Sequence, residues 1–160
     1  MKNEYSGNII KLYGYKLFIN FFFFAGVLVP FFTDWGGITF SQIMILQTFF
    51  MFSVVLLEVP TGAIADYFGR KVSLIFASVM ISLACLVYVS VPSFYVFLIG
   101  EFLWAAAYTL MSGADEALLY DSLIELNKEK ESKKYLGRFS SFEMIGLMIA
   151  APIGSLIAAH

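Results

Sequence analysis

The chain has 160 residues, of which 60% are apolar and only 14% are charged, against about 25% charged residues in a soluble domain. The net charge of −2 and the lack of a basic patch interleaved with aromatic residues argue against a nucleic-acid partner. A single cysteine excludes an internal disulfide, and the lone histidine, His160, argues against a histidine-based metal centre or a Ser-His-Asp triad. This composition is typical of an integral membrane protein.

The hydropathy pattern predicts five membrane spans. A helix needs roughly 20 apolar residues to cross a hydrocarbon core about 30 Å thick. Segments that meet this condition lie at about residues 12–32, 40–60, 72–90, 94–126 and 139–160. The fourth is apolar at its start and amphipathic towards its end. We therefore predict an all-α integral membrane fold in which residues 1–160 form one partial N-terminal transmembrane domain.

The basic residues predict the orientation of these spans. The first group, Lys2, Lys11 and Lys16, is expected to precede the first span, and the other Lys and Arg residues follow the second and fourth spans. The connections at 33–39 and 91–93 contain no basic residue. Alternating spans place every basic group on one side, which the positive-inside rule identifies as the cytoplasm. We expect a multi-pass protein of the inner cell membrane with a cytoplasmic N-terminus.

A segment of small and charged residues lies between the second and third spans. Pro60 and Gly62 are expected to close the second helix, and Gly69 permits backbone conformations that other residues disfavour. Asp66 offers a carboxylate to a cation or to a helix N-terminus. The segment is predicted to be a tight reversal at the membrane surface.

This segment resembles the signature loop of the major facilitator superfamily of secondary transporters. The matching residues are Gly62, Asp66, Gly69, Arg70, Lys71 and Leu74, while two usually basic positions hold Tyr67 and Ser73. The segments 57–62 and 112–117 are similar to a bacterial branch of the family whose substrate is undefined. The resemblance implies the N-terminal helices of a major-facilitator-type bundle.

Such transporters typically have twelve helices in two halves, each built from inverted three-helix repeats. Five spans correspond to one repeat and two further helices, so we expect a fragment of a longer product or a truncated gene product. The resemblance implies a secondary active transporter that moves a small solute by alternating access, with proton coupling and export as finer expectations. Its expected partners are a small-molecule substrate, a coupling proton, the lipid bilayer and the remaining helices.

Polar residues inside the spans are candidates for function because burying them in a membrane is costly. Glu101, Tyr108, Ser112 and Asp115 would fall near one line of a continuous fourth helix. In the family this helix lines the central cavity, so the stripe fits a substrate or proton path. The family often has an Arg where Glu101 stands, which favours a cationic or proton-coupled substrate here. A buried structural hydrogen bond is the alternative role for Glu101.

The same predicted path includes Asn20 in the first span and Gln47 and Glu58 in the second. Asn20 is either a cavity contact or a helix–helix hydrogen bond. The alternative role of Glu58 is a carboxylate that reaches the membrane interface or pairs with Arg70 or Lys71. In the fifth span, small residues recur every four positions and predict a seam for close helix packing: Gly146, Ala150, Gly154 and Ala158.

The family resemblance also implies a cytoplasmic gate that closes when the cavity faces outward. Its expected members are Gly62, Asp66, Gly69, Arg70, Lys71 and Asp121. Arg70 and Asp121 are predicted to lie at the same level of the membrane, where a bidentate pair is sterically reasonable.

Two other functions compete with transport. A non-transporting membrane scaffold or remnant is the main alternative. A membrane-embedded lipid transferase is the remote one, because Asp115, Glu116 and Asp121 resemble its acidic motifs. Asp115 and Asp121, however, point about 240° apart on a helix, so they do not converge on one metal ion. We predict no catalytic residue, cofactor or metal site.

Overall fold

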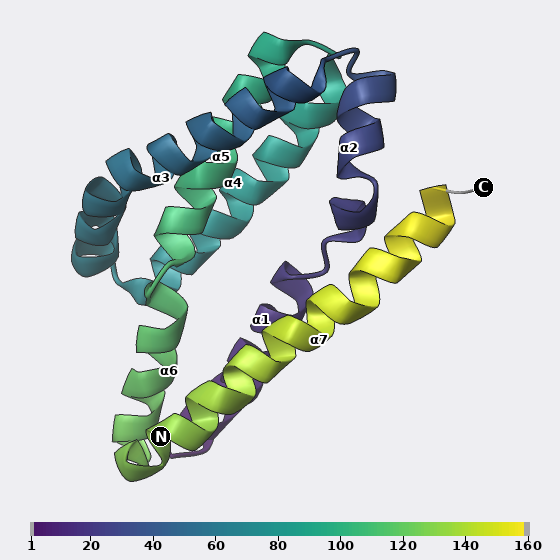
Figure 1. Ribbon diagram of the computed structural model, residues 1–160. Coiled ribbons are helices and arrows are strands. Elements are labelled where there is room, and N and C mark those ends of the chain that lie inside the picture. Colours follow the sequence, from purple (N-terminus) through teal and green to yellow (C-terminus); the bar gives the residue numbers. More distant parts are fainter. Residues whose placement is uncertain (1, 159–160) are drawn as a thin grey trace. The chain divides into compact units, whose positions relative to one another are not determined.

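The structure is a computed structural model of the chain, and residues 2–158 are described, with side chains from residue 7 onward. The described chain is helical and contains no strand (Figure 1). Five of its helical segments are long and apolar enough to cross a membrane: Gly7–Gly26, Phe40–Phe68, Arg70–Ser90, Phe94–Glu125 and Glu129–Ala158. These segments confirm the predicted all-α membrane fold. His160 lies outside the described residues.

The helices belong to two compact units, which are described separately. One unit combines Met1–Leu28 with Asp115–His160, and the other is Val29–Ala114. We call them the terminal unit and the central unit, because the first joins the two ends of the chain.

The central unit is built around one helix. Helix α5 (Phe94–Met111) packs against α3 (Phe40–Phe68) and α4 (Arg70–Ser90) (Figure 1). Aromatic rings fill one end of this packing: Phe32, in the π-helical turn η2 (Phe31–Trp35), lies edge-on to Phe97 with 5.1 Å between ring centroids. At the other end of α5, the hydroxyl of Ser73 donates a hydrogen bond of 2.8 Å to the carbonyl of Leu110. The unit is thus held by aromatic contacts and by a buried polar link between helices.

The terminal unit pairs the two ends of the chain. It contains α1 (Lys2–Ile19), the 3-10 turns η1 (Phe23–Gly26) and η3 (Glu129–Glu131), and the helices α6 (Ala114–Glu125) and α7 (Ser132–Ala158). Figure 1 shows α7 running beside α1, and α7 also packs on η1.

The predicted small-residue seam makes this contact. Gly146, Ala150 and Gly154 are buried on α7. A Cβ atom on Gly146 would lie 2.6 Å from the Leu17 carbonyl oxygen, and one on Gly154 would overlap the carbonyl of Phe23. The prediction is confirmed for these three positions, because only small residues allow the backbones to approach this closely. Ala158 is exposed.

The first span is not the continuous helix that was predicted at 12–32. Helix α1 ends at Ile19, and the chain continues through η1, the short α2 (Leu28–Pro30) and η2. At the break, the backbone N–H of Asn20 bonds the Leu17 carbonyl, while its side-chain amide donates a hydrogen bond of 2.8 Å to the Lys16 carbonyl. In a continuing helix the Lys16 carbonyl would accept a hydrogen bond from the backbone N–H of Asn20. Here it accepts one from the Asn20 side chain, and asparagine side chains compete with helical hydrogen bonds in this way.

The second helix was predicted to close at Pro60 and Gly62, and this prediction is wrong. Helix α3 contains Pro60 and continues to Phe68. Proline has no N–H to bond the Leu56 carbonyl, and the helix nevertheless continues; one residue on, the hydroxyl of Thr61 donates a hydrogen bond of 2.7 Å to the Leu57 carbonyl. The reversal occurs at Gly69 alone, which has a φ of 91°, and α4 begins at the next residue. Most of the signature segment is therefore helical.

The fourth span is also divided. Helix α5 ends at Met111, and α6 begins at Ala114. Between them Gly113 has a φ of 75°, a left-handed conformation that interrupts a right-handed helix. The predicted polar stripe from Glu101 to Asp115 does not therefore lie on one continuous helix.

Candidate functional site

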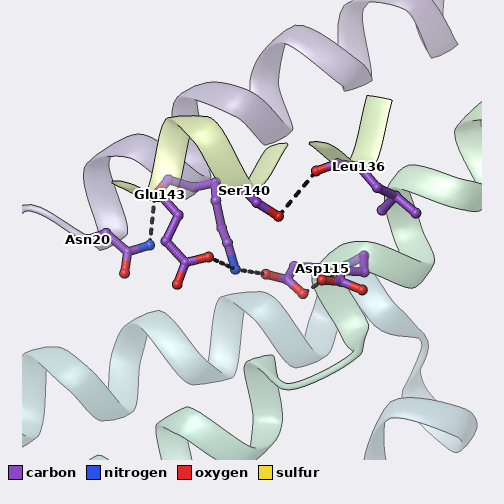
Figure 2. Close-up of polar contacts among 7 residues, drawn as sticks. Asn20, Asp115, Leu136, Ser140 and Glu143 are labelled. Carbon is purple, nitrogen blue, oxygen red and sulfur yellow. Dashed lines mark hydrogen bonds and ion pairs between the residues drawn. The ribbon is translucent and has the colours of Figure 1, made fainter. Parts of the chain in front are cut away.

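Three charged side chains meet in the terminal unit. The Nζ atom of Lys16 lies 2.7 Å from Oδ2 of Asp115 and 3.2 Å from Oε2 of Glu143. Figure 2 shows the carboxylates of Asp115 and Glu143 on two sides of this nitrogen. The charge cluster, defined as Lys16, Asp115 and Glu143, is the strongest candidate site in the unit.

Three helices supply these residues. Lys16 lies in the last turn of α1, Asp115 in the first turn of α6, and Glu143 within α7. The second carboxylate oxygen of Asp115 accepts a hydrogen bond of 2.7 Å from the backbone N–H of Glu116, which holds the side chain at the helix start. Asp115 is thus fixed by its own helix as well as by the lysine.

The surroundings of the ammonium are aromatic. Lys16 Nζ lies 5.0 Å from the ring centroid of Phe139, which is fully buried. Such a distance gives a cation–π attraction. The ring of Tyr13 stacks on Phe142 at 5.1 Å and tilts against Phe139 at 6.2 Å, so the aromatic wall is itself packed.

The cluster lies on helices that are long and apolar enough to cross a membrane, and its formal charge is negative. Lys16 belongs to the candidate span Gly7–Gly26, and Glu143 belongs to the candidate span Glu129–Ala158. One ammonium faces two carboxylates, so the formal charge of the cluster is −1. Charged groups on membrane helices are costly and usually face a cavity or another charge. The three groups here face one another.

The sequence analysis placed Lys16 in the cytoplasmic segment before the first span. In the structure the lysine is buried within the protein and paired with Asp115. The candidate span Gly7–Gly26 includes Lys16, whereas the sequence analysis placed this residue before the first span. A charged residue is tolerated within a span when an opposite charge inside the protein is its partner.

A second buried carboxylate, Glu101, lies on α5 of the central unit. It is 5% exposed and shares a hydrogen bond with the hydroxyl of Tyr88 on α4. Gly100 allows this approach, since a Cβ atom there would lie 3.0 Å from the Tyr88 ring. The ring of Tyr88 in turn packs against Phe32 at 6.0 Å. Glu101 is therefore paired with a neutral phenol inside an aromatic core.

The structure separates the predicted path into different environments. Asn20 and Asp115 lie in the terminal unit, and the others lie in the central unit. Glu101 is buried, whereas Tyr108, two turns along the same helix, is 49% exposed and packs edge-on against Phe50. Of the remaining candidates, Gln47 is half-buried, and Glu58 and Ser112 are exposed.

The predicted gate residues also divide between the units. Gly62 and Asp66 are exposed on α3, and Gly69 forms the turn into α4, which starts with Arg70 and Lys71. Asp121 is exposed on α6 in the terminal unit. The Arg70–Asp121 pair therefore joins residues of two separately described units and stays a prediction.

Sequence reasoning missed two of the three charges in the cluster. Glu143 stands in a long apolar segment, and the rule that an intramembrane acid is a functional candidate would have identified it. Lys16 carried a weaker signal, because a lysine at the edge of an apolar run is normally read as a surface anchor.

The fold and the buried charges define the class: a multi-pass helical membrane protein that holds ionised groups within its spans. The sequence model of the Major Facilitator Superfamily matches residues 16–160, and the chain belongs to this family. The resemblance inferred from the signature segment is thereby confirmed. Searches of curated proteins and of solved structures found no significant match. The family consists of transporters of small molecules, so the chain has a transporter-type function in general.

Proposed function

We propose that the chain is the N-terminal portion of a secondary active transporter that moves a small solute across the cell membrane by alternating access. Membership of the family supports the transport role. The observation that carries the proposal is the pairing of buried charges inside the spans, since a purely structural membrane helix rarely retains them.

The finer proposal is that Glu101 takes up a coupling proton or contacts a cationic group of the substrate. Its partner, the Tyr88 hydroxyl, is neutral. When Glu101 is protonated, it therefore leaves no cation without its partner. Protonation of a carboxylate in a salt bridge, by contrast, leaves the partner cation unpaired. A carboxyl group with a neutral partner is suited to changing its charge during a transport cycle.

Transport in proteoliposomes tests this role. The full-length chain would be assayed against a panel of small solutes, with and without a pH gradient. Glu101→Gln should abolish proton-coupled transport while leaving expression intact. Glu125→Gln, which removes an exposed carboxylate at the end of α6, is the matched control and should retain transport.

Wild-type uptake with wild-type pH dependence in Glu101→Gln would reject the coupling role. A folded protein that transports no solute of the panel would favour the scaffold or remnant alternative.

The proposed orientation places the N-terminus in the cytoplasm and Trp35 outside. A cysteine at position 35, in a background with Cys85→Ser, should react with a membrane-impermeant thiol reagent from outside. A cysteine at position 128, which precedes the candidate span Glu129–Ala158, should react only from the cytoplasmic side. Labelling of position 35 from the cytoplasmic side alone would contradict the orientation.

A further inference from the structure

The two carboxylates and the aromatic ring around Lys16 form a set of groups that recognises an ammonium ion. We propose that Asp115, Glu143 and Phe139 form a binding site for a primary ammonium group, which the Lys16 side chain occupies in this structure and which the amine of a cationic ligand takes when Lys16 leaves. The claim that this ligand is transported rests on the proposed function, whereas the claim that the site binds amines does not.

The contacts are selective for an N–H cation rather than for positive charge alone. An ammonium has three N–H donors and no acceptor. Asp115 Oδ2 at 2.7 Å and Glu143 Oε2 at 3.2 Å each face one donor of Lys16, and the Phe139 ring lies 5.0 Å from the same nitrogen. A quaternary ammonium matches the ring but offers the carboxylates no hydrogen bond.

The charge of the site favours cations even while the lysine is present. The two carboxylates exceed the single ammonium of the cluster by one negative charge, and a negative charge attracts a cation. An approaching amine is therefore attracted before Lys16 has moved, and it completes the site after the lysine has left.

The two carboxylates differ in a way that gives the site an entrance. The Asp115 side chain is 4% exposed and is also bonded by the backbone of Glu116, so it forms the fixed floor of the site. The Glu143 side chain is 35% exposed and its contact with the lysine is longer. An incoming amine can thus meet Glu143 first and Asp115 second.

The position of Lys16 on its helix allows the exchange. The lysine lies in the last turn of α1, and the helix is broken directly after Ile19. Helix ends open more readily than helix centres, because fewer backbone hydrogen bonds must be lost. Release of the lysine requires movement of the end of a helix rather than of its middle.

Chemical rescue tests the site. Lys16→Ala removes the atoms from Cγ to Nζ, and n-propylammonium has the same three carbons and nitrogen. The unfolding temperature of purified Lys16→Ala protein should rise by roughly 2–4 °C in n-propylammonium chloride at about ten times its Kd. Tetramethylammonium chloride at the same concentration should give no rise beyond that of sodium chloride. The double variants Lys16→Ala/Asp115→Asn and Lys16→Ala/Glu143→Gln should lose the response.

An equal rise with both organic salts, or no rise in a folded Lys16→Ala protein, would overturn the proposal. If Lys16→Ala does not fold, binding of n-propylammonium is measured on the wild-type chain and on Glu143→Gln. Saturable binding to wild type that is lost in Glu143→Gln supports the site, and no binding to wild type overturns it. When both proteins fold, wild type should bind at least about 10-fold more weakly than Lys16→Ala, since the tethered lysine competes at an effective concentration in the millimolar range.

These measurements use no transport assay. Failure to bind amines would overturn the site and leave the transporter proposal standing, whereas a failed transport assay with intact amine binding would leave the site standing.

Discussion

The two units of the chain each bury a carboxylate within a membrane span, and they pair it in different ways. In the terminal unit, Asp115 lies 2.7 Å from the ammonium of Lys16. In the central unit, Glu101 is hydrogen-bonded to the neutral hydroxyl of Tyr88. Removing the charge of a carboxylate that is paired with a cation leaves that cation unpaired in a medium of low dielectric constant. A carboxylate paired with a phenol has no cationic partner to leave unpaired.

The two proposals give these regions contrasting roles. In the structure the charge cluster joins helices α1, α6 and α7, and under the proposal it exchanges one cation for another. Under the proposed function, Glu101 gains and loses a proton while Tyr88 stays its partner. The comparison predicts that the two sites respond differently to mutation.

The largest expected effect follows removal of the lysine. Lys16→Met keeps most of the side-chain volume but leaves two carboxylates without their cation, and should lower the free energy of unfolding by about 3 kcal/mol. Glu101→Gln removes a charge but keeps hydrogen-bonding groups, and should change that free energy by about 1 kcal/mol or less. Denaturant unfolding of both variants in the same detergent measures the difference. Equal losses would remove the contrast between the units.

An intermediate effect is expected where backbones, rather than charges, hold the terminal unit. In Gly154→Ala the added methyl group would overlap the backbone carbonyl of Phe23. A backbone carbonyl cannot move aside as a flexible side chain can. The variant should lose roughly 2 kcal/mol of stability. Gly137→Ala, on the same helix with nothing within 4 Å of its Cβ position, is the control and should be neutral or slightly stabilising. Thermal unfolding of both variants checks the prediction, and a loss in Gly137→Ala as large as that in Gly154→Ala would contradict it.

The smallest effect is expected for the predicted pair between the units. Arg70→Ala and Asp121→Ala should each impair transport by the full-length chain, and the double variant should be less than additive. Because Asp121 is exposed, the coupling should be about 1 kcal/mol at most. Arg70→Lys separates a bidentate pair from a simple topology anchor, since an anchor tolerates the change. Strictly additive effects would reject the gate pair.

The sequence was sufficient for the properties that depend on neighbours along the chain. The apolar segments predicted the helical membrane fold, because spanning a hydrocarbon core requires local runs of fixed length. The signature from Gly62 to Leu74 identified the family, and the four-residue spacing of small residues on α7 predicted which face packs closely. Breaks within helices were harder to predict. Asn20 forms a side-chain hydrogen bond where α1 ends, while Pro60 lies inside α3 without ending it.

Only the tertiary structure decided which charges are partners. Lys16 and Asp115 are separated by 99 positions, and no local pattern connects them. From the sequence, Lys16 was interpreted as an anchor at the membrane surface. Asp115 was predicted to lie on the same helix face as Glu101. A left-handed residue at Gly113 interrupts the helix that would have carried this stripe, and packing of α7 on α1 brings Glu143 to the ammonium of Lys16. The physical reason is that a buried charge takes its nearest opposite charge in space, and nearness in space is set by how helices pack rather than by spacing along the chain.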